Sequence, residues 1–173
     1  MQTANKLSNR PSASPAKSRA AAPLPHAIRL LEADHAEVSR CFKEYQKLVK
    51  RKAGANERES LAQHICALLT VHATIEEEIF YPAARVVLDD EALVDEADVE
   101  HACAKDLIAQ IEGMTSGDPL YDAKVKVLGE YIAHHVAEEQ DELFPKVREA
   151  GLDARTVGEE LADRKADLMR AIA

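Results

Sequence analysis

The sequence predicts an all-α protein, an antiparallel four-helix bundle of the kind that can hold a buried polar site, with an additional C-terminal helix. Among 173 residues only 4% are aromatic and six are glycine, whereas the helix-forming residues Ala, Leu, Glu and Lys are abundant. Apolar residues recur at steps of three and four over long stretches, which is the period of an amphipathic helix. With 46% hydrophobic residues, a chain of this length is expected to build one mid-sized domain.

Glycine and proline divide the helical pattern into five segments. The expected helices cover residues 26–52, 56–87, 91–112, 119–150 and 153–172, with breaks at Gly54 and at the turn 113–118. Pro82 and Pro145 fall inside the second and fourth segments. One face of the fourth segment collects apolar and polar residues together, namely Val125, Leu128, Ile132, His135, Glu139 and Leu143.

The first 25 residues have a different composition from the rest of the chain. They contain four prolines and four basic residues and no acidic residue. Such a segment buries too little apolar surface to order itself, so residues 1–25 are expected to form a disordered basic tail. A targeting peptide is the alternative, although early prolines suit an amphipathic transit helix poorly. Residues 26–150 are then the main domain, and 151–173 a helix packed on or near the bundle.

Charge and composition exclude several classes of function. The net charge of −9 repels phosphate backbones, so nucleic-acid binding is not expected. No apolar run approaches the roughly 18 residues of a membrane span. The three cysteines, Cys41, Cys66 and Cys103, lack the paired spacing of a zinc site. No secretory signal precedes them, which predicts a cytoplasmic protein whose reduced thiols pack as small buried groups.

An internal repeat carries the polar residues. Residues 72–82 and 135–145 each contain a His, a Glu four positions on and a Pro six positions beyond that Glu, at a constant offset of 63. Upstream, the pair Asp34-His35 recurs as Glu100-His101 at an offset of 66. Each half therefore has one helix with a single His followed by one with His-x-x-x-Glu, and the chain is predicted to be a doubled helical hairpin.

Spacing gives the repeat a physical meaning. Residues four apart on a helix project from one face, so the His and the Glu of each His-x-x-x-Glu pair can bind the same ion cluster. Two such hairpins packed as a bundle bring four imidazoles and two carboxylates together at its centre. An ionised Glu inside an apolar bundle is costly unless it pairs or ligates, which favours a metal site. The predicted metal ligands are His35, His72, Glu76, His101, His135 and Glu139.

These segments resemble the hemerythrin, or HHE cation-binding, family over about residues 26–150. The resemblance implies an antiparallel four-helix bundle with a non-haem di-iron centre, held by the four histidines and bridged by the two glutamates named above. Its cofactor would be two Fe ions with an oxo or hydroxo bridge, for which Mn or Zn are substitutes. The similarity is greatest to bacterial members with four His and two Glu, among them the iron-centre repair proteins.

One departure separates this chain from the oxygen-carrying hemerythrins, which have an additional His on the third helix. Here Ala97 and Lys105 occupy the positions four before and four after His101. The last carboxylate, Glu139, follows His135 at a spacing of four, where the oxygen carriers place Asp at five. Two octahedral ions offer roughly 12 positions, so six protein ligands and a bridge leave about one exchangeable position per metal. Reversible oxygen carriage is therefore not expected.

Two classes of function follow from this site. We expect a protein that binds O2, NO or peroxide for sensing or stress response, with no organic cofactor and no catalytic residue assigned. The alternative is a redox enzyme or repair protein acting on NO, peroxide or damaged iron clusters, and iron storage or delivery is a third possibility. No substrate pocket or nucleotide loop is recognisable in the sequence, which favours binding over turnover.

Several polar residues near the motifs are given ordinary roles. His26, His64 and His134 have no partner in the repeat and are interpreted as surface or core residues. Glu77 and Glu138 are expected on the wet outer face, with assistance to the site as the alternative. Tyr131 is expected to pack in the core rather than donate to a bound ligand. Lys105 is expected to extend outward rather than into the ligand region.

Overall fold

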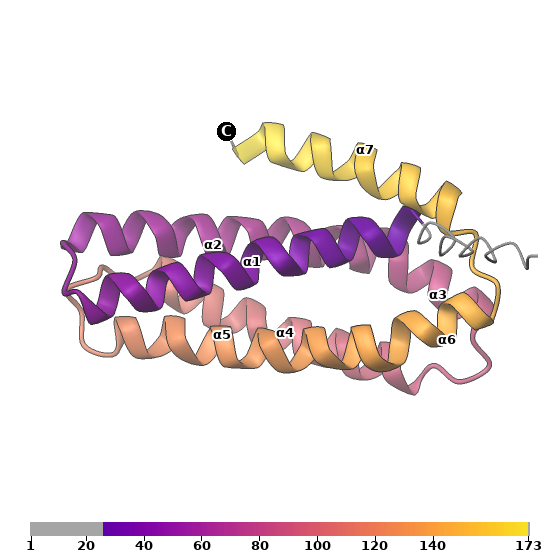
Figure 1. Cartoon of the computed structure of the whole chain (residues 1–173), viewed down its shortest axis with the longest axis horizontal. Coiled ribbons are helices and arrows are strands. Elements are labelled where there is room, and N and C mark those ends of the chain that lie inside the picture. Colours follow the sequence, from indigo (N-terminus) through magenta and orange to yellow (C-terminus); the bar gives the residue numbers. More distant parts are fainter. Residues whose placement is uncertain (1–25, 173) are drawn as a thin grey trace, which may run out of the picture.

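The computed structural model describes residues 26–172, and these are almost entirely helical (Figure 1). The predicted tail, residues 1–25, lies outside the described residues. The elements are α1 (His26–Lys50), α2 (Ala55–Ile75), η1 (Glu76–Phe80), α3 (Tyr81–Val87), α4 (Ala92–Glu112), α5 (Tyr121–Glu138), η2 (Glu139–Leu143), α6 (Phe144–Glu149) and α7 (Ala154–Ile172), where η denotes a π-helical turn.

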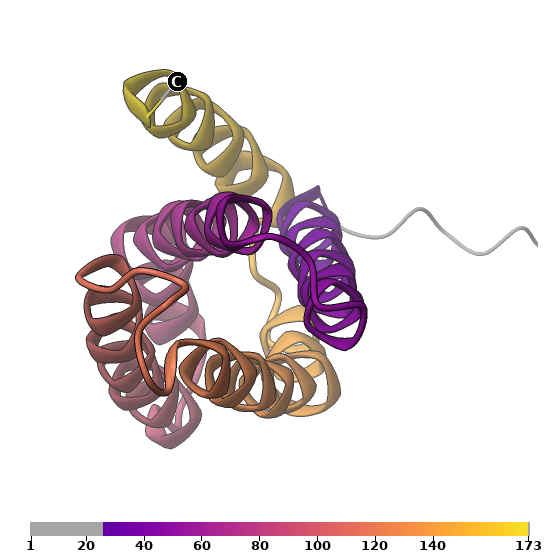
Figure 2. The ribbon, with the colours of Figure 1, turned by 90° about the vertical axis from the view of Figure 1, so that its left-hand side faces the viewer.

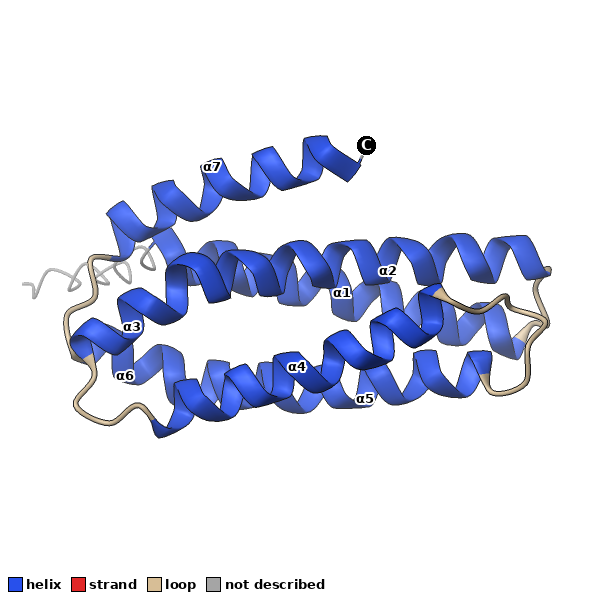
Figure 3. Cartoon of the chain, turned by 180° about the vertical axis from the view of Figure 1, so that it is seen from behind, coloured by secondary structure: helices blue, strands red, loops and turns tan. Residues whose placement is uncertain are grey.

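α1, α2, α4 and α5 form a ring when the bundle is viewed along its axis (Figure 2). α1 packs against α2 and α5, and α4 closes the ring by packing against the same two helices. α3 and α6 continue α2 and α5 beyond the π turns, as the view from behind shows (Figure 3). α7 lies outside the ring against α1 and α2. The predicted fold, an antiparallel four-helix bundle with an additional C-terminal helix, is confirmed.

The two π turns are the one feature of the helices that the sequence analysis did not anticipate. Segments 56–87 and 119–150 were expected to be continuous α-helices, but each is interrupted by five π-helical residues. Pro82 and Pro145 then fall in the first turn of α3 and α6. Proline has no N–H for the helical ladder, so it is tolerated at the start of a helix and disruptive inside one. The interruption places each proline where its missing donor costs little.

Buried apolar side chains form two clusters, one at each end of the bundle. The first lies near α3, α6 and α7 and includes Ile28, Phe80, Phe144 and Leu161. The second lies near the α1–α2 turn and includes Phe42, Ile65, Ile108 and Leu128. On each of the four long helical paths, buried polar residues fall between the two clusters; they are Asp34, His35, His72, Glu76, Glu100, His101, His135 and Glu139. The bundle therefore contains a polar layer sealed by apolar layers on both sides.

The cysteines follow the expectation only in part. Cys66 is buried, Cys41 is half-buried and Cys103 is exposed, and all three are free. Burial of Cys103 was therefore a wrong prediction, because its position on α4 faces outward. Among residues 26–172, none of the helices combines the length and the apolar character needed to cross a membrane.

Candidate metal centre

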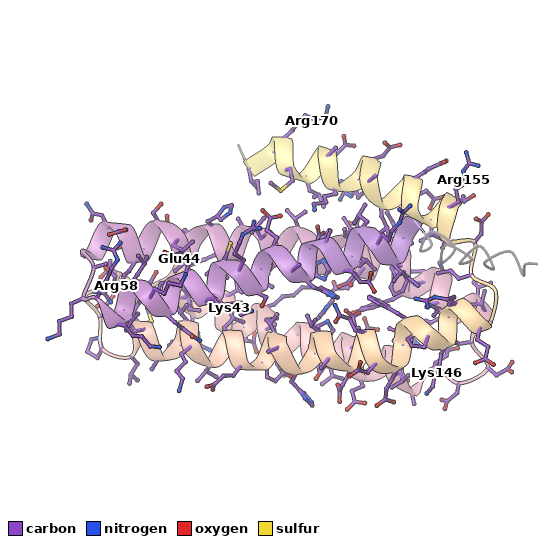
Figure 4. The ribbon with its side chains drawn as sticks, in the orientation of Figure 1. Lys43, Glu44, Arg58, Lys146, Arg155 and Arg170 are labelled. Carbon is purple, nitrogen blue, oxygen red and sulfur yellow. The ribbon has the colours of Figure 1, made fainter. Side chains whose placement is uncertain are left out.

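The polar layer holds the six residues predicted as ligands. His35 comes from α1, and His101 comes from α4. The other four come from the His-x-x-x-Glu motifs, in which each Glu is the first residue of a π turn. All six side chains are buried, and Glu76 has no exposed surface at all. Figure 4 shows their setting, with side-chain nitrogen and oxygen atoms gathered inside the bundle while labelled residues such as Arg155 and Arg170 point outward from α7.

The imidazoles approach one another in two pairs. The Nε2 atoms of His35 and His72 are 3.0 Å apart, and those of His101 and His135 are 3.2 Å apart. Glu139 faces one imidazole from each pair, because its Oε2 lies 3.2 Å from His35 Nε2 and 3.6 Å from His135 Nε2. The carboxylate of Glu139 therefore faces both pairs of imidazoles.

Glu76 occupies the matching position on the other side. Its Oε2 lies 3.1 Å from His72 Nε2 and 3.4 Å from His101 Nε2. Three buried oxygens, Glu76 Oε1, Glu76 Oε2 and Glu139 Oε2, have no hydrogen-bond partner among the described residues. Buried carboxylate oxygens without partners carry a large desolvation cost. A cation between the imidazole pairs would satisfy them, so the residues present fit a metal centre.

The other ring nitrogen of each histidine faces outward to a hydrogen-bonding group. His72 Nδ1 lies 3.4 Å from Asp34 Oδ2, and His135 Nδ1 lies 2.7 Å from Glu100 Oε2. These acids are the ones that precede His35 and His101 in the sequence repeat, yet each holds the histidine of the following helical path. A carboxylate on Nδ1 fixes the ring with Nε2 available to a metal, which is the usual outer support of metal-bound histidine.

The remaining two histidines are supported by residues that directly follow the ligand glutamates. His101 Nδ1 lies 2.9 Å from Glu77 Oε1, and His35 Nδ1 lies 3.2 Å from the amide of Gln140. Glu77 also accepts a hydrogen bond of 2.6 Å from Lys105 Nζ. The outward direction expected for Lys105 is therefore confirmed, whereas Glu77 contacts the site, which was the less favoured of its two interpretations.

α7 contacts one of the residues that support the histidines, although it lies outside the bundle. Lys165 donates to Asp34 Oδ1, so a chain of contacts runs from α7 through Asp34 to His72. Its neighbour Arg164 forms a two-point ion pair with Glu78, with distances of 2.6 and 2.9 Å. Two adjacent basic residues thus attach α7 to α1 and to η1.

Tyr81 is a site residue that the sequence analysis missed. Its hydroxyl donates to Glu139 Oε1 at 3.0 Å and lies 3.3 Å from His101 Nε2. In a regular α-helix, a residue five positions after Glu76 would point about 140° away from it. The π turn removes this rotation and brings both side chains inward. Burial, together with the charges of Glu76 and Glu139, raises the pKa of Tyr81 well above its usual value.

Other residues considered in the sequence lie outside the converging set. His64 is exposed, and His134 lies on the surface 3.3 Å from Glu138. The side chain of His26 is outside the described part of the chain. Tyr131 is partly buried against the apolar cluster near the α1–α2 turn, in agreement with the packing role expected for it.

In the absence of metal, protonation of His72 balances part of the negative charge of the buried carboxylates. Burial lowers the pKa of His72, but the charge of Glu76 and the hydrogen bond to Asp34 outweigh burial and raise it to about 10. Burial likewise opposes ionisation of Glu76, yet the facing His72 and His101 hold its pKa well below the usual range. Imidazolium and metal ion therefore compete for the same carboxylate oxygens.

Fold and site together define a class: a four-helix bundle whose buried imidazoles and carboxylates converge from all four helical paths to bind metal. The match to the family model described as the hemerythrin HHE cation binding domain covers residues 26–147, and the chain belongs to this family.

Two individual proteins are similar to this chain. A solved hemerythrin HHE cation binding domain-containing protein from Mycobacterium kansasii superposes with a TM-score of 0.69 and 21% identity, covering 84% of this chain and 88% of that one. A protein named DNA nickase from Nostoc sp. is 27% identical over 125 residues, which is 69% of this chain and 32% of that protein. The chain thus spans about a third of the length of this relative.

Metal should stabilise the protein more strongly as the pH rises. His72 contributes to metal-free stability fully below its unfolded pKa of 6.5, and this contribution is lost as the pH rises toward 10. Metal binding needs neutral imidazole, so it strengthens over the same range. At 100 times its Kd, a ligand adds about 2.7 kcal/mol, or about 5–10 °C in a domain of this size.

Melting curves of the metal-free and metal-loaded protein, recorded by circular dichroism at several pH values between about 6 and 9, check this expectation. The gap between the two melting temperatures should widen with pH. A gap that stays constant or narrows would show that His72 does not exchange its proton for metal. The helical signal at low temperature serves as the control, because the apolar layers should keep both forms folded.

Proposed function

We propose that this protein is a non-haem di-iron protein that binds a small molecule such as O2, NO or peroxide at its metal centre, in sensing, binding or stress response. The observation that carries the proposal is the convergence of four Nε2 atoms on Glu76 and Glu139, three of whose oxygens have no hydrogen-bond partner among the described residues, with every Nδ1 held from outside. The proposed ligands are His35, His72, Glu76, His101, His135 and Glu139.

Two ions fit the donor set better than one. The ligand atoms form two groups, one with His35, His72 and both glutamates and the other with Glu76, His101 and His135. Imidazole and carboxylate donors without thiolate suit iron or manganese, and zinc is a further substitute. Bound iron would supply redox chemistry and open coordination positions to the small ligand.

Small molecules have a route to the centre between α1 and α5. A cleft of about 280 Å3 is lined by the proposed ligand His35 together with Phe42, Gly129 and Ala133. An ideal Cβ on Gly129 would lie 2.9 Å from the Phe42 ring, so glycine leaves room for this ring beside α5. The mostly apolar walls suit uncharged ligands such as O2 and NO.

The same access would also serve turnover, so a redox enzyme acting on NO, peroxide or damaged iron clusters is the second candidate. DNA cleavage, the activity in the name of the Nostoc relative, receives no support from the site or from the net charge of −9. We further propose that residues 26–150 are the di-iron domain with α7 as an accessory helix, and that the protein acts in the cytoplasm.

The first test is metal content. Protein purified without oxygen should contain about two irons per chain, measured by elemental analysis. Glu76→Ala or Glu139→Ala should lose most of both irons, because each glutamate is proposed to bridge them. His64→Ala removes an exposed histidine and should keep both. A wild-type protein with one zinc and no iron uptake, or equal loss in all three variants, would refute the di-iron centre.

The second test separates binding from turnover. The reduced protein should form a nitrosyl spectrum with NO at no more than one or two equivalents per chain and should oxidise under O2 without a long-lived oxygen adduct. Consumption of NO or peroxide over many equivalents with a reductant, abolished by Glu76→Ala, would make the redox enzyme the correct function. A stable oxygen adduct would instead indicate an oxygen carrier.

The third test concerns the cleft. Ala133→Phe places a ring in the route to His35 and should slow NO binding several-fold in stopped-flow absorbance measurements, with iron content unchanged. Ala137→Phe, at an exposed alanine one turn further along α5 that does not line the cleft, is the matched control and should bind at the wild-type rate. Equal rates in both variants would mean that the ligand enters elsewhere.

A further inference from the structure

Among the described residues, Tyr81 has a buried polar side chain in the site but belongs neither to the six proposed ligands nor to the residues that hold a histidine Nδ1. Tyr81 is the first residue of α3, and its side chain, which is 1% exposed, extends into the polar layer. There its hydroxyl oxygen meets ligand atoms from two other elements, His101 on α4 and Glu139 on η2. The phenol therefore lies among the proposed metal ligands and not behind them.

The spacing of these atoms is that of neighbouring ligands on one ion. Metal bonds of about 2.1 Å at right angles place adjacent ligand atoms about 3 Å apart. The Tyr81 oxygen is 3.0 Å from Glu139 Oε1 and 3.3 Å from His101 Nε2. By comparison, Glu76 Oε2 is 3.4 Å from the same His101 nitrogen. The phenol oxygen is thus as close to His101 as a proposed bridging carboxylate is.

We infer that Tyr81 is a seventh protein ligand, binding through its phenol oxygen to the metal ion held by His101 and His135. This inference rests on the proposed di-iron function. Coordination would form a metal–oxygen bond and break the phenol O–H bond, with the proton passing to solvent water, and no electrons are transferred. A cation in contact with the oxygen favours this loss, since bound ions reverse the local preference for the neutral phenol.

The sequence repeat shows that this ligand is confined to one half of the centre. The residue 63 positions after Tyr81 is Phe144, which has no donor atom. Its ring stacks on His35 with centroids 5.9 Å apart and an interplanar angle of 3°. The ion held by His35 and His72 therefore lacks a matching ligand and keeps more exchangeable positions. His35 also borders the cleft, so external small molecules reach the ion with the open positions.

Spectroscopy of the full chain loaded with iron(III) tests this inference. A phenolate bound to iron(III) gives a charge-transfer band in the visible region and enhances tyrosine ring modes in resonance Raman spectra. Wild-type protein should show both. Tyr81→Phe should lose both while retaining two irons per chain. Tyr131→Phe, which removes the phenol of a partly buried tyrosine away from the ligands, is the matched control and should keep them.

The outcomes distinguish this inference from the proposed function, because iron is measured in the same samples. Two irons without phenolate modes, or modes that persist in Tyr81→Phe, would overturn the inference alone, whereas a chain that takes up no iron would overturn both. If Tyr81→Phe folds poorly, ring-deuterated tyrosine in the wild-type chain identifies the modes. Replacement of Tyr45, Tyr121 and Tyr131 by Phe should then leave them in place, and their loss in any of these variants would contradict the assignment.

Discussion

The structure depends on two carboxylates, Glu76 and Glu139, that are placed where water cannot solvate them. Their side chains are 0% and 2% exposed, and three of their four oxygens lack a hydrogen-bond donor from the described chain. An uncompensated buried charge costs several kcal/mol, a large fraction of the stability of a domain. Bound cations would give the four converging imidazoles and the two carboxylates common partners, and the apolar layers at both ends shield the site from water.

The fold and the six proposed metal ligands could be predicted from local periodicity, because apolar and polar residues recur in the sequence at helical spacing. Spacing of four places His72 with Glu76 on one face, and the repeat supplies the other hairpin. Tyr81 could not be found in this way, and the supporting role of Glu77 was only the less favoured of two interpretations. Both positions depend on the π turn that begins at Glu76, and one extra residue in a turn shifts every later side chain around the helix. The embedded Pro82 was the available signal, because an interior proline requires a local interruption.

The proposed ligands of this site follow the sequence repeat, but some of the residues that surround them do not. The ligands and the acids Asp34 and Glu100 obey the repeat, but Glu77 corresponds to the neutral Gln140, and Tyr81 to Phe144. Glu77 also accepts a hydrogen bond from Lys105, whereas Gln140 has no such contact with a lysine among the described residues. A histidine whose Nδ1 faces a carboxylate is a more basic ligand than one that faces an amide. The two halves of the site are therefore chemically unequal, and in the proposed di-iron centre the more electron-rich metal position would be the one at His101.

Each half of the site also places one lysine against a supporting acid, from α7 in one half and from α4 in the other. Lys165 on α7 shares Asp34 with His72, as Lys105 shares Glu77 with His101, and each lysine draws negative charge away from the supported ring. The unequal supports are those of the other two histidines, the carboxylate of Glu100 for His135 and the amide of Gln140 for His35. Because a weaker acceptor on Nδ1 makes Nε2 a weaker donor to metal, the half with Gln140 has the less basic imidazoles, and it is also the half in which Phe144 replaces the tyrosine. The less basic imidazoles and the cleft at His35 thus lie in the same half of the site. In the proposed di-iron centre, an ion held there would bind external ligands more readily than the ion at His101.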